Sequence, residues 1–276
     1  MKKLFSALLA LACVASVAVM AVGCTKNTKK YKAVELVGVE AESYGYAVKK
    51  GENANVIEAC NEVINAEDFS VKADELVKYY TAVYGGETPT ALSFELPDLS
   101  DNTAGTLTVG TEAGFAPFEF VDNKYGYQGF AGLDIAVMMM VAEKLNYTLT
   151  ISDMNFDSLP AALASGSIDI IAAGFTNDEE RAKTMDFSAN YFTSSQYIVC
   201  LDSAEYTDIE SLKDLTIAVQ MGTTGDFLIS DEIDLDHLGS AEVKQYKSIT
   251  LAMQDLKKGT VDCIVIDELP AKSLIG

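Results

Sequence analysis

Three consecutive segments decide the fold: TLTVGT at residues 106–111, DIAVMMMVAEKL at 134–145 and YTLTI at 147–151. Apolar and polar side chains alternate in the first segment, as in a strand with one buried face, and the third is also predicted to be a strand. The middle segment is apolar on nearly every side, and it predicts a buried helix with a cap at Asp134 and a stop at Asn146. A strand, a helix and a strand in this order predict a βαβ unit.

The same alternation of strands and helices continues to the last residues of the chain. It indicates α/β lobes with mostly parallel sheets, in which ligands bind at the carboxyl ends of the strands. The positions expected at such ends are Gly110, Ala173, Gly174, Gly222, Thr223 and Asp267. Further strands are expected at 170–173, 196–201, 216–220 and 261–266, with helices beginning near Asp157 or Ser158, Asn177 or Asp178, Thr223, and Ser248 or Thr250.

Residues 87–104 differ from the segments on either side of them. They contain Pro89 and Pro97, scattered Ser, Thr and Asp residues, and little periodicity. This composition predicts a linker in coil conformation.

The first residues have the layout of a secretory signal. Lys2 and Lys3 precede an uncharged apolar stretch, and Gly23-Cys24 follows it where cleavage is expected. A helix that spans the membrane is the alternative, since the stretch is just long enough to cross a bilayer. Residues 21–24 (AVGC) resemble a lipobox, which implies that Cys24 carries a lipid anchor on the outer face of the cytoplasmic membrane.

Charge and composition exclude several classes of protein. The net charge is −21, and removal of residues 1–23 with their two lysines takes it to −23, so nucleic acid is not an expected partner. A single histidine, His237, and the lack of any CxxC spacing argue against a metal site. Cys60, Cys200 and Cys263 lie in apolar runs and are expected to be buried thiols, although a Cys200–Cys263 disulfide stays open. No cofactor is expected.

Several short motifs, in order along the chain, resemble the polar amino-acid-binding family (family 3) of bacterial ABC-importer solute-binding proteins. The resemblance covers residues 104–276 with few gaps. The motifs are VGTE at 109–112 with APFEF at 116–120, GLD at 132–134, NFDSL at 155–159, GFT at 174–176 with ER at 180–181, DFS at 186–188, QMGTTG at 220–225 and VID at 265–267. This likeness implies a two-lobed periplasmic-binding-protein-like (type II) fold that binds an amino acid between its lobes.

Amino-acid chemistry fits the same positions. Arg181 can grip a carboxylate with two parallel bonds, helped by Thr176, by Thr223-Thr224 and by the N-terminus of a short helix that bears Arg181. Asp267 can accept from an ammonium group together with the Gly174 carbonyl. The alternatives are a surface ion pair of Arg181 with Glu179 or Glu180, a helix cap at Asp267, and a bare turn at 222–225.

The remaining candidates concern the ligand's side chain. Phe115 and Phe156 are expected to sandwich it, unless they are ordinary core residues. Glu112 and Gln220 would face its far end and set specificity, which favours a polar or basic L-amino acid.

The first third of the chain departs from the family's order. In the family, a return strand, a hinge and a final helix pair follow the aspartate strand. Here residues 33–39 and 42–51 resemble the return segment, and 55–64 and 71–84 resemble the helices, but all of them precede residue 104. We therefore expect a circular permutation, in which residues 86–103 join the old ends. The alternative is a shortened family member with an unrelated N-terminal module.

The expected organisation follows from this order. Residues 1–23 form the signal and 24–30 the lipid-anchored tether. Residues 44–190 form one lobe, and 31–40 with 195–276 form the other, joined by crossings near 40–44 and 190–195. Hinge closure would trap the ligand.

The expected function is that of an exported, membrane-anchored monomer, not an enzyme, which delivers a free L-amino acid to ABC permease and ATPase subunits. Two alternatives are a sensor for a signalling partner and a cyclohexadienyl dehydratase-like lyase on the same fold. The lyase needs a second acid or base beside Glu112, and the sequence offers no evident one.

Overall fold

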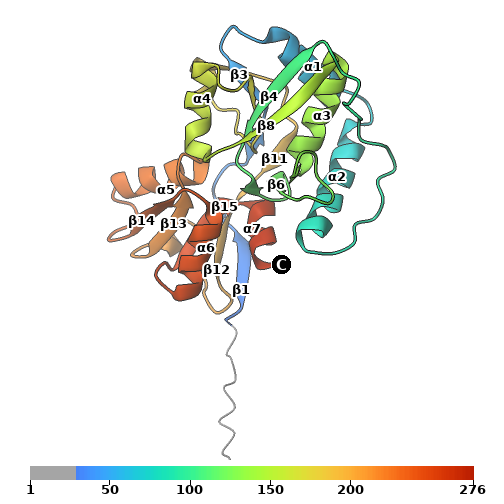
Figure 1. Ribbon diagram of the computed structural model, residues 1–276. Coiled ribbons are helices and arrows are strands. Elements are labelled where there is room, and N and C mark those ends of the chain that lie inside the picture. Colours follow the sequence, from blue (N-terminus) through green and yellow to red (C-terminus); the bar gives the residue numbers. More distant parts are fainter. Residues whose placement is uncertain (1–28) are drawn as a thin grey trace, which may run out of the picture.

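The computed structural model describes residues 29–276, which form two lobes, each built on a five-stranded sheet (Figure 1). The strand order in the first lobe is β10 (Met185–Phe187), β3 (Ala47–Lys49), β9 (Ile170–Ile171), β4 (Gly105–Thr111) and β8 (Tyr147–Asp153). In the second lobe it is β1 (Tyr31–Glu35), β12 (Gln196–Leu201), β15 (Cys263–Asp267), β13 (Thr216–Gln220) and β14 (Glu242–Tyr246).

Both sheets are mixed, which corrects the expectation of mostly parallel strands. In the first lobe β4 runs parallel to β8 and β9, whereas β3 is antiparallel to β9 and β10. In the second lobe β13 runs parallel to β14 and β15, whereas β12 is antiparallel to β1 and β15. The parallel pairs follow from the βαβ units, and the antiparallel ones involve strands on either side of the two crossings between the lobes.

Helices cover the two sheets. The first lobe has α1 (Ala54–Ile64), α2 (Phe69–Tyr84), α3 (Leu133–Leu145) and α4 (Leu159–Ser165), and the second has α5 (Thr224–Asp234), α6 (Ile249–Lys258) and α7 (Glu268–Ile275). Short elements are β5 (Gly114–Phe115), β6 (Glu119–Val121), β7 (Phe130–Ala131), η1 (Phe156–Ser158), η2 (Arg181–Lys183) and η3 (Glu210–Leu212). Asn146 ends α3 in a left-handed conformation, as expected, but the residue at its N-cap is Gly132. The predicted cap, Asp134, lies within the first turn and is fully buried.

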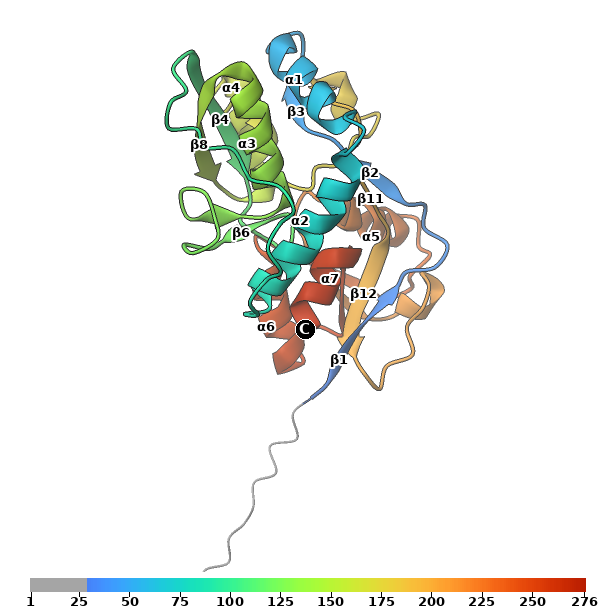
Figure 2. The same cartoon turned by 90° about the vertical axis from the view of Figure 1, so that its right-hand side faces the viewer.

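Two antiparallel strands pass between the lobes side by side (Figure 2). They are β2 (Glu42–Tyr44) and β11 (Phe192–Ser194), and Tyr44 lies opposite Phe192. Both expected crossings therefore exist, and they are hydrogen-bonded to each other.

Residues 31–49 contribute strands to both sheets. Along β1, residues from Tyr31 to Glu35 lie opposite residues of β12, and β3 lies between β9 and β10 in the first lobe. Leu36 extends the contact with the second lobe: its amide donates to the Gln196 carbonyl at 2.8 Å, and its side chain is 1% exposed. The predicted pairing of 33–48 with strands of both lobes is therefore present in the structure.

The linker between α2 and β4 contains no helix or strand, but it is not a free coil. Leu99 is buried in the core of the first lobe. The Ser93 amide donates to Glu75 Oε1 at 2.6 Å, and Asn102 Nδ2 donates to the Tyr147 carbonyl at 2.8 Å. These contacts fix the linker along the lobe, which its Pro-rich and polar composition did not indicate.

The structure places the three cysteines of the described residues and the single histidine. Cys60, Cys200 and Cys263 are buried free thiols, although Cys200 and Cys263 lie opposite each other on β12 and β15. His237 is exposed beside Glu232.

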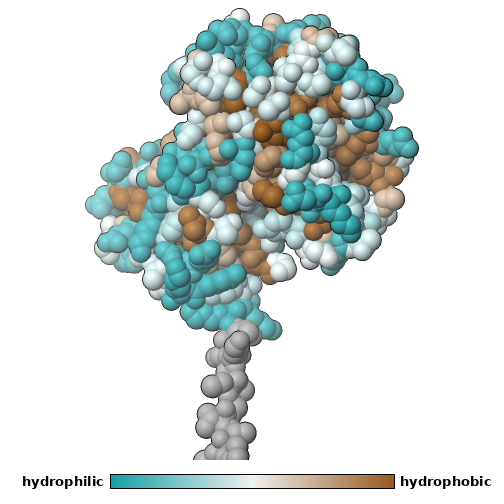
Figure 3. Space-filling model, viewed as in Figure 1, coloured by the Kyte–Doolittle hydropathy of each residue, from teal (hydrophilic) through white to brown (hydrophobic). Residues whose placement is uncertain are grey.

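Hydrophilic side chains cover much of the visible face of both lobes (Figure 3). Within residues 29–276 no helix is long and apolar enough to cross a membrane, and no cluster of three or more His, Cys, Asp or Glu residues could hold a metal ion. The predicted signal and Cys24 lie outside the described residues.

Candidate functional site

A pocket between the lobes brings together eight of the eleven predicted ligand-binding residues. Its lining comprises Phe115, Phe156, Gly174 and Thr176 from the first lobe, and Gln220, Thr223, Thr224 and Asp267 from the second. Thr176 follows β9, Gln220 ends β13 and Asp267 ends β15, so carboxyl ends of strands supply the pocket from both sides, as such folds require. The side chains of the pocket nearly fill it.

Arg181 lies beside this pocket and connects the two lobes. Its Nη1 donates to the Thr176 carbonyl and its Nη2 to the Gly222 carbonyl, both at 3.1 Å. The guanidinium also lies 4.1 Å from the centroid of the Phe175 ring and 3.5 Å from an Asp178 carboxylate oxygen. Burial lowers the pKa of Arg181. An ion pair between Lys247 and Asp157 also joins the two lobes, so the lobes are closed upon each other.

The local structure around Arg181 differs from the expectation. The predicted helix is only the single 3₁₀ turn η2, and the Arg181 amide donates to Asp178 Oδ1 at 2.8 Å, so no α-helix N-terminus faces the pocket here. The alternative role of Arg181 was a surface ion pair with Glu179 or Glu180, but its carboxylate partner is Asp178, and Glu180 pairs with Lys183. In the second lobe, by contrast, α5 begins after Thr223 as predicted, and Thr223 Oγ1 accepts from the Asp226 amide.

Asp267 is a buried carboxylate at the end of β15. It is 5% exposed, and Tyr44 Oη donates to its Oδ1 at 2.6 Å. Burial, followed by the nearby Glu42 carboxylate, raises the pKa of Asp267 well above its ordinary value. Asp267 also occupies the N-cap position of α7, as the alternative role requires, but its side chain makes no cap hydrogen bond to that helix.

Gly174 supplies a backbone corner of the pocket. Its φ of +54° is left-handed, and a Cβ there would lie 2.7 Å from Phe115 Cε1, so only glycine fits. The Gly174 amide donates to Asp134 Oδ2 at 2.9 Å, and Tyr191 Oη donates to the same oxygen at 2.8 Å. This buried support fixes the turn. Ala173 is buried in the core and does not line the pocket.

Glu112 and Gln220 form a polar pair with unmet hydrogen-bonding capacity. Their side chains are 8% and 2% exposed, and Glu112 Oε2 and Gln220 Nε2 have no hydrogen-bond partner within residues 29–276. Burial raises the pKa of Glu112 to about 7, and Gln220 acts in the opposite direction. A buried polar atom without a partner costs about 1–3 kcal/mol, which a ligand with polar groups would recover.

The model of the bacterial extracellular solute-binding proteins, family 3, matches residues 107–265, which is more than half of the chain. The chain belongs to this family. The match covers every residue that lines the pocket except Asp267, which lies two residues beyond it, so the family and the geometry point to the same site.

Relatives of this solute-binding protein include proteins named for amino-acid binding. The chain is 30% identical over 167 residues to a probable histidine-binding protein of Neisseria gonorrhoeae, covering 60% of each chain. It is 30% identical over 178 residues to the arginine-binding extracellular protein ArtP of Bacillus subtilis, covering 63% of this chain and 65% of that one. The match thus spans less than two thirds of either relative.

Among solved structures, an ancestral arginine-binding protein bound to glutamine has a TM-score of 0.56 and 37% identity, over 62% of this chain and 73% of its own. Arginine-bound ArgBP from T. maritima, residues 20–233, has a TM-score of 0.56 and 36% identity, over 62% and 77%. The two-lobed periplasmic-binding-protein fold is therefore the fold of this chain.

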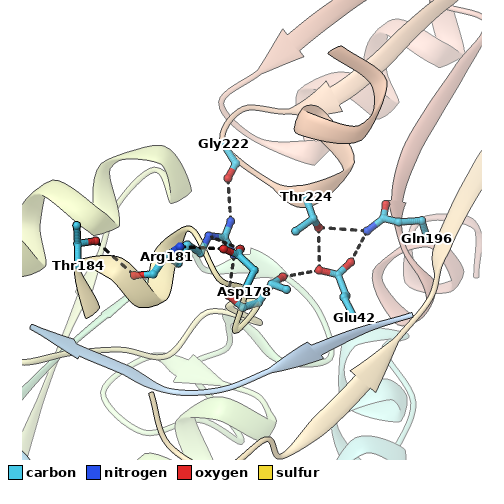
Figure 4. Close-up of polar contacts among 8 residues, drawn as sticks. Glu42, Asp178, Arg181, Thr184, Gln196, Gly222 and Thr224 are labelled. Carbon is cyan, nitrogen blue, oxygen red and sulfur yellow. Dashed lines mark hydrogen bonds and ion pairs between the residues drawn. The ribbon is translucent and has the colours of Figure 1, made fainter. Parts of the chain in front are cut away.

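One polar residue beside this pocket was missed from the sequence. Glu42, on the crossing strand β2, accepts hydrogen bonds from both lobes (Figure 4). It lies outside the residues matched by the family model, and its only sequence signal is its position two residues before Tyr44, on the same face of a strand.

Proposed function

We propose that this solute-binding protein holds a free L-amino acid between its lobes. Arg181, with the hydroxyls of Thr176, Thr223 and Thr224, would bind the carboxylate, and Asp267 with the Gly174 carbonyl would bind the ammonium group. The observation that carries the proposal is a closed inter-lobe pocket with the buried Asp267 carboxyl in its lining and the Arg181 guanidinium, whose side chain is 11% exposed, beside it. The guanidinium complements the carboxylate of an amino-acid zwitterion, and the Asp267 carboxyl complements its ammonium group.

The ligand's side chain is proposed to be polar or basic, with arginine or lysine first and glutamine second. Phe115 and Phe156 offer apolar faces in the pocket, while Glu112 and Gln220 hold a carboxylate oxygen and an amide without partners. Both orphan groups suit a guanidinium, an ammonium or an amide. Relatives named for histidine, arginine and cystine binding agree with this class of ligand.

A thermal-shift screen tests the ligand class. The protein from Cys24 onward is mixed with each of the twenty amino acids, ornithine and cystine, since a ligand that binds the folded state raises its melting temperature. We expect the largest shift with arginine, lysine or glutamine. Shifts with leucine or valine and with no polar amino acid would rule out the proposed ligand class.

The destination of the ligand is proposed to be ABC permease and ATPase subunits, with Cys24 anchoring a monomer at the outer face of the cytoplasmic membrane. Cys24→Ser should move the protein from the membrane fraction to the medium or periplasm. A Cys24→Ser protein that still pellets with membranes would indicate a spanning segment instead. A signalling partner remains the alternative destination, and co-purification with a permease distinguishes the two.

Binding without catalysis is the proposed role. One structural neighbour, the ancestral amino-acid-binding protein AncCDT-1, is described as a precursor of cyclohexadienyl dehydratase, with 31% identity and a TM-score of 0.53. Turnover of prephenate or arogenate by the purified protein would contradict the proposal and favour the lyase.

We further propose that the chain is a circular permutation of its family. Three features support this order. First, β1 belongs to the sheet of the second lobe and β3 to that of the first. Second, β2 forms one of the two crossings, and third, Lys29–Tyr31 and Leu274–Gly276 line one pocket together. The lobes would be 44–190, including the linker at 86–103, and 31–40 with 195–276. Lys29 lies in the lobe that bears Asp267, where a tether from Cys24 would therefore enter.

Reversing the order tests the permutation. In a rearranged chain, residues 29–84 follow Gly276 through a short Gly/Ser joint and the chain begins near Asp101. If the permutation is correct, this chain should fold and bind the same ligand within about threefold of wild-type affinity, ~0.65 kcal/mol. Failure of the rearranged chain to bind, with wild-type binding intact, would favour an unrelated N-terminal module.

A further inference from the structure

Glu42 occupies an unusual position between the lobes. Its Oε1 accepts from Gln196 Nε2 at 2.6 Å, and its Oε2 accepts from Thr224 Oγ1 at 2.8 Å, both in the second lobe. The same Oε2 accepts from Thr176 Oγ1 in the first lobe. Thr176 and Thr224 both line the pocket, so Glu42 lies directly behind that lining, one hydrogen bond away from it, although it belongs to a crossing strand.

A second carboxylate lies beside it. Glu42 is among the causes that raise the pKa of Asp267, after burial, and Tyr44 on the same strand donates to Asp267. Arg181 is the cation that the structure places near both carboxylates, and its guanidinium is engaged by two backbone carbonyls and Asp178. Two neighbouring carboxylates in a site of low exposure repel each other, and a cation placed between them relieves that repulsion.

The acceptors around Glu42 are not all used. A carboxylate has about four acceptor sites, and the described contacts of Glu42 use three of them. Gln196 is 4% exposed, and its Oε1 has no donor among the described residues. An ammonium group carries three N–H donors and no acceptor, so it matches a corner with Asp267, Glu42 and a spare carbonyl oxygen.

We infer that Glu42 is a ligand-binding residue, a second carboxylate that receives the ligand's α-ammonium group together with Asp267. The inference rests on the proposed binding of an amino acid and adds a residue to that site. Because the partners of Glu42 come from both lobes, its contact with the ligand also links ammonium recognition to lobe closure. The site then favours ligands that bring more positive than negative charge.

The test separates recognition of the ammonium group from a general effect on closure. Titration calorimetry compares wild type with Glu42→Gln, which keeps the side chain's size, and with Glu40→Gln, a control at an exposed position two residues away on the same segment. The ligands are L-arginine, agmatine, which keeps the amine but lacks the carboxylate, and 5-guanidinopentanoic acid, which keeps the carboxylate but lacks the amine. L-glutamine and glutaramic acid form a second pair.

For Glu42→Gln we expect at least a tenfold loss of affinity for L-arginine and for agmatine, and less than a threefold change for 5-guanidinopentanoic acid. Glu40→Gln should match wild type with all ligands. An equal loss with and without the amine would mean that Glu42 acts on closure alone, and unchanged affinity would mean that it does not act on the ligand. Either result overturns the inference while wild-type binding of the amino acid stands. A wild type that binds no amino acid overturns the proposed function itself, and the inference with it.

Discussion

Residues 31–84 and residues 105–276 contribute to the same two sheets, yet only the second region is matched by its family's model. The second region supplies every residue that lines the pocket. The first supplies β1, β3 and the crossing strand β2. On β2, Tyr44 donates to the pocket residue Asp267, and Glu42 accepts from the pocket residue Thr224. The comparison shows that a segment outside the family match can still be part of the fold. The strands of residues 31–49 pair with matched strands in both sheets.

The largest expected effect lies in the matched region. Arg181→Ala should raise the ligand's Kd by at least about thirtyfold, because loss of a buried partner leaves the carboxylate unpaired, at a cost of roughly 2–5 kcal/mol. Titration calorimetry measures it. Lys183→Ala, on the same 3₁₀ turn but exposed, is the control and should bind as wild type does. A change within about threefold for Arg181→Ala, ~0.65 kcal/mol, would remove Arg181 from the site.

The next prediction tests whether the first region is an integral part of the second lobe. Leu36→Ala should lower the free energy of unfolding by about 2–4 kcal/mol, because Leu36 is 1% exposed among the core residues of that lobe. Val37→Ala, at a side chain that is 60% exposed, should change it by less than about 0.5 kcal/mol. Urea denaturation measures both. Equal, small effects would indicate that residues 31–40 are an appendage.

A smaller effect is expected where the two regions meet. Tyr44→Phe removes the donor to Asp267 and should lower the free energy of unfolding by about 1.5 kcal/mol, the upper end for an ordinary intramolecular hydrogen bond. Tyr84→Phe, at a side chain that is 42% exposed, is the control. Thermal denaturation measures both variants. If they are equally stable, the bond between Tyr44 and Asp267 does not stabilise the contact between the two regions.

The smallest effect concerns pH. Burial raises the pKa of Glu112 from 4.5 to about 7. Between these two pH values Glu112 is protonated in the folded protein, whereas it is ionised in the unfolded chain. Stability without ligand should therefore fall as pH rises from about 4.5 to 7. Affinity for arginine should rise by up to about tenfold from pH 6 to pH 8, because a cationic side chain needs the ionised carboxylate.

Glu112→Gln is the matched variant for the pH prediction. It should flatten the dependence of affinity on pH, leaving the contribution of Asp267, a pocket residue whose pKa burial and the Glu42 carboxylate raise well above its ordinary value. Calorimetry at three pH values measures this, and an unchanged slope in Glu112→Gln would assign the pH dependence to another group.

The sequence predicted what depends on local signals. Thr223 caps α5, Ser248 caps α6, and Asn146 ends α3 in a left-handed conformation, as expected from their types and positions. It also predicted the strands that carry the pocket, since their apolar runs are bounded by glycine and polar residues.

The sequence failed where a distant contact overrides a local preference. Asp134 has the chemistry of a cap, but the Gly174 amide and Tyr191 draw it into the core. The segment at Arg181 is a single 3₁₀ turn, and its guanidinium is bound by the carbonyls of Thr176 and of Gly222, which is 41 residues away. Glu42 could not be assigned, since its partners are between 134 and 182 residues away along the chain.

The pairing of β1 with β12 also has a consequence for the time at which the second lobe can form. Tyr31–Glu35 leave the ribosome long before their partners at 196–201. At roughly 5–20 residues per second, the wait is on the order of 10–30 s, during which this strand has no sheet to join. Unpaired strands of this kind associate readily with other chains. The order of the chain therefore requires that the first strand be kept from associating with other chains during synthesis. A protein whose neighbouring strands are synthesised one after the other has no such requirement.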